Sequence, residues 1–311
     1  MNYVHGGDVY RRAVDLDYSV NINPLGMPPR ACAAAKHGVD QSTAYPDWKV
    51  EKLRDAVVSF LNRKFAPVAP EWISFGNGAA DLIYRLMQVL RPQQVVVAAP
   101  AFAEYSVAAE RVGAQVVPVY LPEAADFSFT PAVEAGVIRA IEAAPSGSAV
   151  FLCNPNNPDG NVIRAEVLQR IATVCEARNS WLIVDECFLP FLPSGDSSNR
   201  TEECFSEMES GQEAEKCAAR MPKAIYSEDR SNAAATQFSN AEHALCPNEL
   251  ECSMVPSLRA FPHLVILRAF TKIYGMPGLR LGYMLTAAQV LTDKLPAYAP
   301  VADYAAILQA L

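Results

Sequence analysis

The 311-residue sequence predicts an α/β protein with a mostly parallel central sheet and helices on both faces of that sheet. Four short apolar runs, at residues 94–99, 149–153, 181–185 and 264–268, have the length and composition of buried strands. Amphipathic helical stretches separate most of these runs, which is the alternation typical of parallel sheets. A hydrophobic content of 51% is sufficient for the core that such a sheet requires.

The charge and cysteine patterns exclude several classes of partner. A formal net charge of −8 argues against non-specific binding to nucleic acid or to anionic membranes. The sequence has neither an apolar run of the ~18 residues that a membrane span requires nor the basic and apolar regions of a signal peptide. The eight cysteines are scattered without metal-ligand spacing. We therefore expect a cytoplasmic protein with reduced thiols, no metal, and no nucleic-acid or membrane partner.

The first 30 residues lack helical or strand periodicity and contain two turn-rich clusters, one at His5-Gly-Gly-Asp and one at 21–26. This turn chemistry favours an ordered N-terminal arm, residues 1–30, that lies over an active-site mouth. The alternative is a frayed terminus. A helix with one apolar face is expected at 49–62, and Asp47 is placed to cap it.

A glycine turn between a strand and a helix predicts a phosphate site. The strand at 72–75 is followed by Gly76-Asn-Gly-Ala-Ala and then by a helix from about 81 to 90. Free backbone N–H groups and the positive end of the helix dipole bind phosphate in this geometry. The dinucleotide-binding fingerprint is excluded because its third glycine is absent, and a lone Gly-x-Gly pair is a weak signal.

Polar or aromatic residues follow three of the other predicted strands. Phe102 comes after the strand at 94–99, and the turn Asn-Pro-Asn-Asn-Pro-Asp-Gly at 154–160 comes after the strand at 149–153. Asp185 ends an apolar strand, where a carboxylate is costly unless it meets a cation. It is interpreted as a partner for a protonated ring nitrogen, or alternatively as a cap. Further elements are a strand at 116–120 and helices at 131–144 and 165–179.

Residues 194–257 break the alternation of strands and helices. The block holds 12 acidic and 5 basic residues, so nearly all of the net charge of the chain lies within it. Such a composition buries little apolar surface, and it predicts an exposed, disordered insertion.

Lys272 stands just past the strand at 264–268 and is followed by a Gly/Pro-rich turn. Ligands of open α/β sheets bind at the carboxyl ends of strands. A lysine that is partly withdrawn from water has a lowered pKa and reacts with carbonyl groups, which suits it to hold an aldehyde cofactor. The alternative is an ordinary surface lysine after a strand. A strand at 281–285 and a helical run that stops at Leu311 complete the chain.

Taken together, these features resemble the fold-type I pyridoxal-phosphate aminotransferases in order and spacing. Within that superfamily, the stretches His-Gly-Gly-Asp, Asn-Ile-Asn-Pro-Leu-Gly-Met-Pro, Phe-Ala-Glu-Tyr and Ile-Tyr-Gly-Met-Pro-Gly-Leu-Arg are most similar to the threonine-phosphate decarboxylases of cobalamin biosynthesis. The histidinol-phosphate aminotransferases are the near relatives of that group. Three residues after the strand-end aspartate those aminotransferases usually carry Tyr, whereas this chain has Phe188, as the decarboxylases do.

The resemblance implies a cofactor, pyridoxal 5'-phosphate, and a reaction, the decarboxylation of L-threonine O-3-phosphate to (R)-1-amino-2-propanol phosphate. Two alternatives stay open. One is transamination of the histidinol-phosphate kind, and the other is a truncated cofactor-binding fragment with little activity.

The resemblance also implies roles for individual residues. Lys272 would bind the cofactor covalently, Asp185 would keep the pyridinium nitrogen protonated, Asn157 would donate to the phenolic oxygen, and Phe102 would stack on the ring. The phosphate would be held by Gly78, Ala79, Thr271 and Arg280. Tyr45 would reach the phosphate of the neighbouring subunit, which implies a homodimer with shared sites. The phosphorylated amino-acid substrate would meet His5 and Asn21.

Three departures from the family pattern affect these expectations. Ala269 stands where relatives carry a Ser or Thr hydroxyl, and Asp159 stands where Thr is usual. One hydrogen bond to a charged group is worth roughly 1.5–3 kcal/mol, so cofactor affinity would fall without being abolished. The family continues into a C-terminal small domain whose arginine binds the substrate carboxylate, and residues 31–311 correspond only to the large domain. The small domain is therefore expected to be missing.

Overall fold

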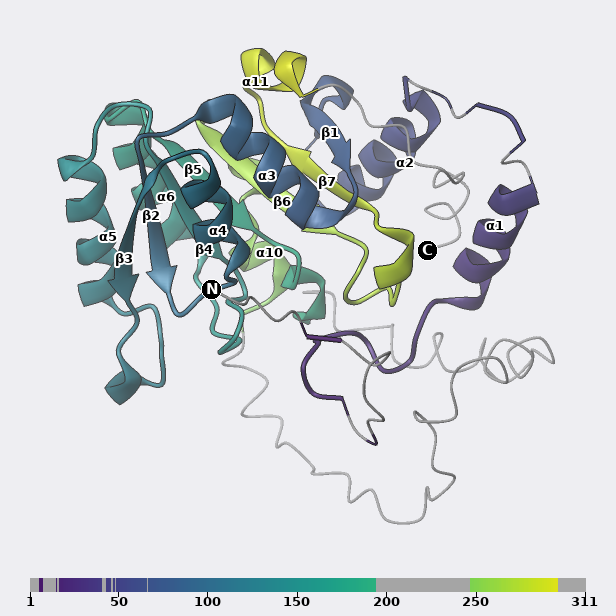
Figure 1. The fold of residues 1–311 in the computed structure, drawn as a ribbon, viewed down its shortest axis with the longest axis horizontal. Coiled ribbons are helices and arrows are strands. Elements are labelled where there is room, and N and C mark those ends of the chain that lie inside the picture. The colour runs from purple at the N-terminus through teal and green to yellow at the C-terminus, as the bar shows by residue number, and fades with distance from the viewer. Residues whose placement is uncertain are drawn as a thin grey trace.

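The computed structural model describes residues 6–7, 15, 17–40, 43–45, 47, 49–65, 67–193 and 247–295. A seven-stranded sheet in the order β1-β7-β6-β5-β4-β2-β3 forms the centre of the molecule (Figure 1). The strands are β1 (Ile73–Gly76), β2 (Gln94–Ala99), β3 (Gln115–Tyr120), β4 (Ala149–Cys153), β5 (Trp181–Asp185), β6 (Leu264–Ala269) and β7 (Gly282–Leu285).

The sheet is mostly parallel, as expected, with β7 antiparallel to both of its neighbours. The central strands are closely aligned at their carboxyl ends. Cys153 pairs with Asp185, and Asp185 pairs with Leu267 of β6. The segments that follow β4, β5 and β6 therefore leave the sheet at one edge.

Helices cover both faces of the sheet. They are α1 (Pro29–Asp40), α2 (Glu51–Asn62), α3 (Gly78–Leu90), α4 (Glu104–Arg111), α5 (Pro131–Ala143), α6 (Ala165–Ala177), α10 (Glu249–Cys252) and α11 (Gln289–Lys294). Alternate residues of each strand face opposite cores, because side chains of a strand alternate between its two sides. Val95 and Val97 pack with α3, α4 and α11, whereas Val96 and Ala98 belong to the core under α2, α5 and α6.

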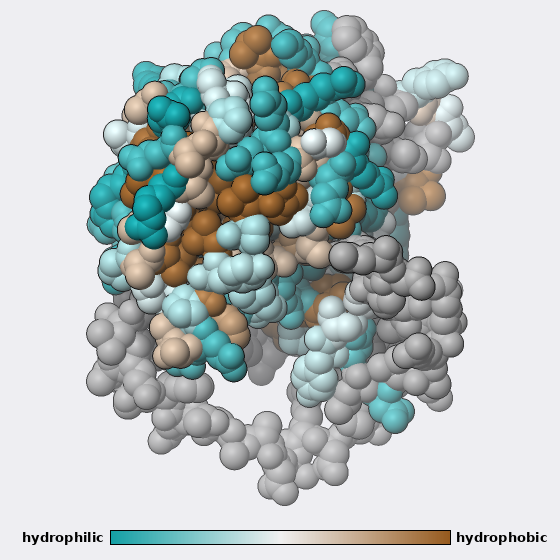
Figure 2. Space-filling model, turned by 60° about the vertical axis from the view of Figure 1, so that its left-hand side comes forward, coloured by the Kyte–Doolittle hydropathy of each residue, from teal (hydrophilic) through white to brown (hydrophobic). Residues whose placement is uncertain are grey.

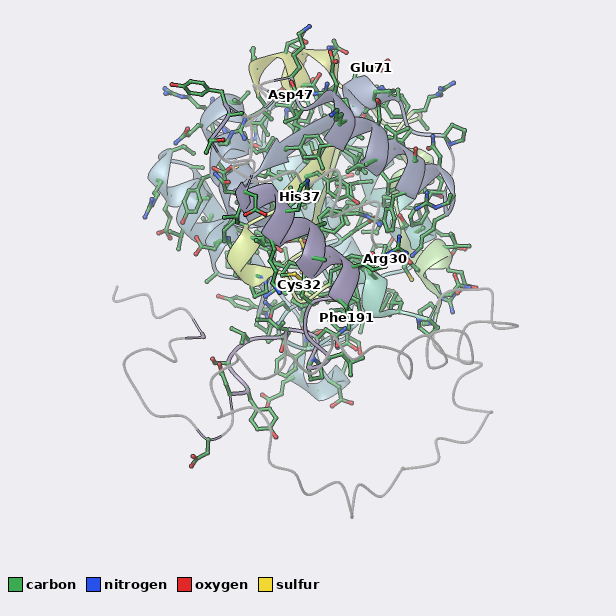
Figure 3. All side chains as sticks on the ribbon, turned by 90° about the vertical axis from the view of Figure 1, so that its right-hand side faces the viewer. Arg30, Cys32, His37, Asp47, Glu71 and Phe191 are labelled. Atoms are coloured by element: carbon green, nitrogen blue, oxygen red, sulfur yellow. The ribbon has the colours of Figure 1, made fainter. Side chains whose placement is uncertain are left out.

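The expected helices agree with the structure to within a few residues, but Asp47 is not the N-cap of α2, because that position is Val50, which makes no side-chain cap hydrogen bond. The carboxylate of Asp47 accepts from Lys49 N at 3.0 Å and from Glu51 N at 3.1 Å. Sequence reasoning missed α1, which lies near α2 at the β1 side of the sheet (Figures 1 and 3). Arg30, Cys32 and His37 lie along it (Figure 3).

The other end of the sheet is the edge strand β3, on the side of the molecule that Figure 2 brings forward. Val116, Val117 and Val119 are only half-buried there, and Tyr120 is exposed. Pro118 interrupts this apolar edge and has no N–H to donate. It thereby disfavours pairing with a further strand.

The end of the acidic block requires a correction. Residues 247–257 were expected in an exposed insertion, but one side of α10 and most of the turn after it are buried. Cys252, Met254 and Val255 belong to the protein interior, and Glu249 is buried beside Arg268. Composition misplaced this boundary because the acidic Glu249 has cationic partners. The rest of the expected insertion, 194–246, lies outside the described residues, as do 296–311.

Candidate active site

The carboxyl ends of the parallel strands bring four of the predicted site residues to one edge of the sheet. Phe102 follows β2, Asn157 follows β4, Asp185 ends β5, and Lys272 follows β6. The strand register aligns three of these strand ends, because Cys153, Asp185 and Leu267 stand in one row. The edge where α/β sheets bind ligands is therefore also the edge where these side chains lie.

Asp185 is 4% exposed and has two hydrogen-bond donors. The Tyr105 hydroxyl donates to Oδ2 at 2.8 Å, and the Cys187 backbone N donates to Oδ1 at 3.0 Å. Burial, together with the neighbouring Asp185 charge, raises the pKa of Tyr105 well above its usual value, so this phenol remains a donor at neutral pH. These two donors offset part of the cost of burying the carboxyl group.

Tyr105 was not singled out by sequence reasoning, although it ends the Phe-Ala-Glu-Tyr stretch. Its ring stacks on Phe151 with centroids 4.7 Å apart, and it meets Phe102 edge-on at 5.6 Å. A single buried side chain therefore orients Asp185 through its hydroxyl and supports the ring of Phe102 through its edge.

Lys272 is half-buried at the start of the Gly/Pro-rich turn. Burial lowers the pKa of its amine, and Arg280 lowers it further, while Cys187 and Asp185 act in the opposite direction. Its Nζ lies 5.4 Å from the centroid of the Phe188 ring. A lysine with a lowered pKa has a larger neutral fraction at a given pH, which is the form that attacks a carbonyl.

The N-terminal arm contacts the lysine turn directly. Asn23 N donates to the Lys272 carbonyl at 3.1 Å, and Asn23 Nδ2 donates to the Ile273 carbonyl at 2.8 Å. A β carbon on Gly275 would lie 2.4 Å from the carbonyl carbon of Gly26, so glycine is required for this close approach. Asn21 is exposed two residues before Asn23. His5, also expected near the substrate, lies outside the described residues.

The predicted phosphate turn joins β1 to α3. Gly78 has φ +81, and a β carbon there would lie 2.8 Å from Arg280 Nη2. The Arg280 guanidinium also donates to the Asn77 carbonyl at 3.2 Å. Gly282 of β7 approaches the same turn, since a β carbon on it would lie 2.9 Å from Ala79 N. The first turn of α3, the Arg280 guanidinium and the start of β7 are thus packed closely together, and the glycines at 78 and 282 allow this approach.

These groups fit a phosphorylated pyridine cofactor. The amides at the N-terminus of α3 and the Arg280 guanidinium are the donors that a phosphate requires. Thr271 is buried next to Lys272, and Tyr45 is fully exposed. Asn157 is half-buried in its turn. The adjacent Asn156 ties that turn to the end of β2 by donating from Nδ2 to the Pro100 carbonyl at 3.0 Å.

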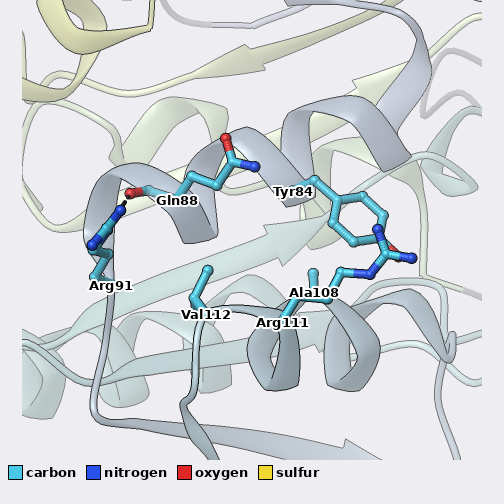
Figure 4. A pocket seen from close by; sticks show the side chains of 6 residues that line it. All are labelled: Tyr84, Gln88, Arg91, Ala108, Arg111 and Val112. Carbon is cyan, nitrogen blue, oxygen red and sulfur yellow. Dashed lines mark hydrogen bonds between the residues drawn. The ribbon is translucent and has the colours of Figure 1, made fainter.

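A separate cavity of about 370 Å³ lies between α3 and α4 (Figure 4). The Arg111 guanidinium lies 4.9 Å from the centroid of the Tyr84 ring at one end of this cavity. At the other end, Arg91 Nε donates to the Gln88 carbonyl at 3.4 Å. No predicted site residue lines the cavity, so it is distinct from the strand-end site. Within the described part of the chain, no group of three or more His, Cys, Asp or Glu is arranged to hold a metal ion.

The chain belongs to the aminotransferase class I and II family, which matches residues 14–215. The cofactor of this family is pyridoxal 5'-phosphate, and the expected cofactor is thereby confirmed. None of the helices in the described ranges is long and apolar enough to cross a membrane.

Two curated relatives are named for two different enzymes. The chain is 29% identical over 294 residues to threonine-phosphate decarboxylase of Salmonella typhimurium, covering 92% of this chain and 62% of the relative. It is 30% identical over 282 residues to histidinol-phosphate aminotransferase of Symbiobacterium thermophilum, covering 90% of this chain and 59% of the relative. The chain thus spans less than two thirds of the length of both relatives.

Solved structures give the same architecture. The histidinol-phosphate aminotransferase of Clostridium acetobutylicum superposes with a TM-score of 0.65 at 25% identity, covering 95% of this chain and 68% of that one. The expected fold-type I large domain, with its mostly parallel sheet covered on both faces, is confirmed.

Proposed function

We propose that this chain forms the cofactor-binding part of a decarboxylase that converts L-threonine O-3-phosphate into (R)-1-amino-2-propanol phosphate. This reaction belongs to cobalamin biosynthesis in the group that the chain resembles. The similarity to the decarboxylase of Salmonella typhimurium supports the proposal. The observation that carries it is the apolar ring of Phe188 beside the Lys272 amine, at 5.4 Å, in the position where the aminotransferases usually carry a phenol.

When bound, pyridoxal 5'-phosphate supplies an electron-accepting ring that stabilises negative charge on the substrate α-carbon. Each of the proposed site residues then has a defined role. The Lys272 amine would hold the cofactor at its aldehyde carbon and would supply the proton that replaces the carboxylate on the substrate α-carbon. The Asp185 carboxylate, oriented by Tyr105, holds a proton on the ring nitrogen. Phe102 would pack against the ring and shield it from water.

Phosphate binding and ring electronics depend on further residues. Arg280, Thr271 and the amides of Gly78 and Ala79 bind the cofactor phosphate. Asn157 donates to the phenolic oxygen of the ring. A tyrosine in place of Phe188 would be a second donor to that oxygen and would increase the electron demand of the ring. With phenylalanine, Asn157 is the main donor, which fits a site that does not have to reverse a transamination.

We further propose that the active form is a homodimer. The full exposure of Tyr45 supports this assignment, because the residue is free to reach the phosphate site of a neighbouring subunit. The contact of the arm with the Lys272 carbonyl supports a role for residues 1–30 at the substrate mouth, where His5 and Asn21 are proposed to meet the substrate. The cytoplasmic location is likewise a proposal and rests on the sequence.

Transamination is the second candidate, supported by the similarity to the aminotransferase of Symbiobacterium thermophilum. One experiment separates the two reactions. The purified protein, loaded with pyridoxal 5'-phosphate, is incubated with L-threonine O-3-phosphate or with histidinol phosphate, each with and without 2-oxoglutarate. The proposal predicts release of carbon dioxide from threonine phosphate without 2-oxoglutarate. Turnover that requires 2-oxoglutarate and releases no carbon dioxide would favour transamination instead.

A further inference from the structure

A buried series of alternating charges lies behind the strand ends that carry Asp185 and Lys272. In β6, Arg268 donates from Nη2 to Glu186 Oε2 at 2.6 Å and from Nε to the same oxygen at 3.0 Å. Its Nη1 lies 3.4 Å from Glu249 Oε1, and Lys64 Nζ lies 3.2 Å from Glu249 Oε2. Arg268, Glu186 and Glu249 are 3%, 0% and 4% exposed, so the series is almost fully desolvated.

Burial of these charges is a poor source of net stability. Desolvation of buried ion pairs offsets much of their attraction, and apolar residues of similar volume often serve stability equally well. A guanidinium with several acceptors does fix geometry, because its planar donors hold their partners in set directions. The pKa of Arg268 is raised because Glu186 and Glu249 outweigh the effect of burial, so the cation persists at every physiological pH.

One line of contacts runs from Arg268 to Asp185. Glu186, which follows Asp185 directly, accepts from Arg268, from the Ser253 hydroxyl at 3.2 Å and from Met254 N at 2.7 Å. Its own N donates to the Leu267 carbonyl at 2.8 Å. Both the side chain and the backbone of Glu186 therefore have fixed partners. These contacts restrain the peptide bond between Asp185 and Glu186, and so the orientation of Asp185.

A second line of contacts runs from Arg268 to Lys272. Arg268 pairs with Tyr283 in the β6–β7 register. Burial raises the pKa of Tyr283 to about 12, while the nearby Arg268 acts in the opposite direction. The ring of Tyr283 lies 5.6 Å from Phe270, and Phe270 lies 5.3 Å from Tyr274. Phe270 and Tyr274 flank Lys272 two residues away on each side, so their packing sets where the lysine turn lies.

We propose that Arg268 is a positioning residue that acts through Glu186 on Asp185 and through Tyr283 on the Lys272 turn, and that it thereby keeps the lysine amine partly withdrawn from water. This inference rests on the proposed role of Lys272, but not on which reaction follows cofactor binding. The groups that face Arg268 are Glu186 from the end of β5, Glu249 from α10 and Tyr283 from β7, with Tyr274 nearby.

The test uses the apo-protein and follows reductive methylation of Lys272 by formaldehyde and borohydride as a function of pH, with peptide mass mapping. The double variant Arg268→Met with Glu186→Gln removes the pair without leaving Glu186 charged, and Glu249 keeps Lys64 as its partner. The labelling midpoint of Lys272 is expected to rise toward 10.5, the ordinary pKa of a solvated lysine, because the amine is no longer held partly out of water. Arg268→Lys, which keeps the charge but loses the planar fork, is expected to shift the midpoint in the same direction.

Urea unfolding of the same variants separates positioning from stability. Arg268→Met alone is expected to unfold at a lower urea concentration than wild type. The double variant is expected to have an unfolding midpoint between those of Arg268→Met and wild type. Val137→Ala in α5 is the matched control, because it removes buried volume far from the site and is expected to leave the Lys272 midpoint unchanged. A folded double variant with the wild-type midpoint would overturn the proposal. A midpoint shift in Val137→Ala as large as in the double variant would also overturn it.

Discussion

Gly78→Ala is the substitution that tests the phosphate turn most sharply. The added β carbon lies 2.8 Å from Arg280 Nη2, so the guanidinium must move away from the N-terminus of α3. Losing one hydrogen bond to a charged group costs roughly 1.5–3 kcal/mol. Since about 1.4 kcal/mol corresponds to a factor of ten, the Kd for pyridoxal 5'-phosphate is expected to rise roughly 10- to 150-fold.

The substitution also strains the backbone, because Gly78 has φ +81. An L-residue in this region costs roughly 1–2 kcal/mol, and this loss falls on folding stability. Gly113→Ala is a matched control. It has φ +80, and no atom lies within 4 Å of the added β carbon. It is expected to lose similar stability in urea unfolding while keeping the wild-type affinity for the cofactor.

The assay is a titration of each apo-protein with pyridoxal 5'-phosphate, followed by the visible absorbance of the bound cofactor. Pyridoxal, which has no phosphate, serves as a second ligand and is expected to bind Gly78→Ala and wild type alike. Wild-type affinity for the phosphorylated cofactor in folded Gly78→Ala would refute the assignment of this turn. An equal loss of cofactor affinity in Gly78→Ala and Gly113→Ala would show that backbone strain alone was responsible for it.

Three further outcomes are expected. Tyr105→Phe removes a donor to the buried Asp185 carboxylate, so the free energy of unfolding is expected to fall by roughly 1.5–3 kcal/mol in urea titrations, and an unchanged midpoint would contradict that contact. Because burial lowers the pKa of Lys272, its labelling by an aldehyde is expected to reach half-maximum below pH 10.5; a midpoint at or above that value would count against a withdrawn amine. Deleting 197–246 is expected to preserve cooperative unfolding, because Glu249 N lies 3.1 Å from the Pro193 carbonyl and the two ends of the deletion are therefore close together. Deleting 197–256 also removes core residues and is expected to abolish cooperative unfolding. Equal stability of the two deletion variants would contradict the burial of residues in and after α10.

Much of the fold could be predicted from local patterns. The buried strands are continuous apolar runs. Charged residues at or just past their ends, such as Asp185 and Lys272, stand out against these runs in the sequence. The parallel register of β4, β5 and β6 then places these strand ends side by side, as expected for any parallel sheet. Helix α1 was missed because it follows the turn-rich arm and buries only two small residues, Ala31 and Gly38, so no long apolar side chains mark it in the sequence.

Partners that are distant in the sequence could not be predicted. Tyr105 bonds to Asp185 across 80 positions, and nothing local to either residue specifies the other. Glu249 sits in a stretch that looks solvated, yet it is buried because Arg268 and Lys64 neutralise it. From composition alone a carboxylate is predicted to be exposed, because burying an unpaired charge is costly. The cations that pair with Glu249 are found only in the tertiary structure.

Whether Lys272 binds the cofactor covalently can be measured directly. The most direct measurement is to mix the apo-protein with pyridoxal 5'-phosphate, reduce with borohydride and map the modified lysine by peptide mass spectrometry. A phosphopyridoxyl group is expected on Lys272 alone, at one per chain, with no such adduct in Lys272→Ala. A stable adduct on another lysine, or an adduct spread over several surface lysines while Lys272 stays unmodified, would contradict this expectation.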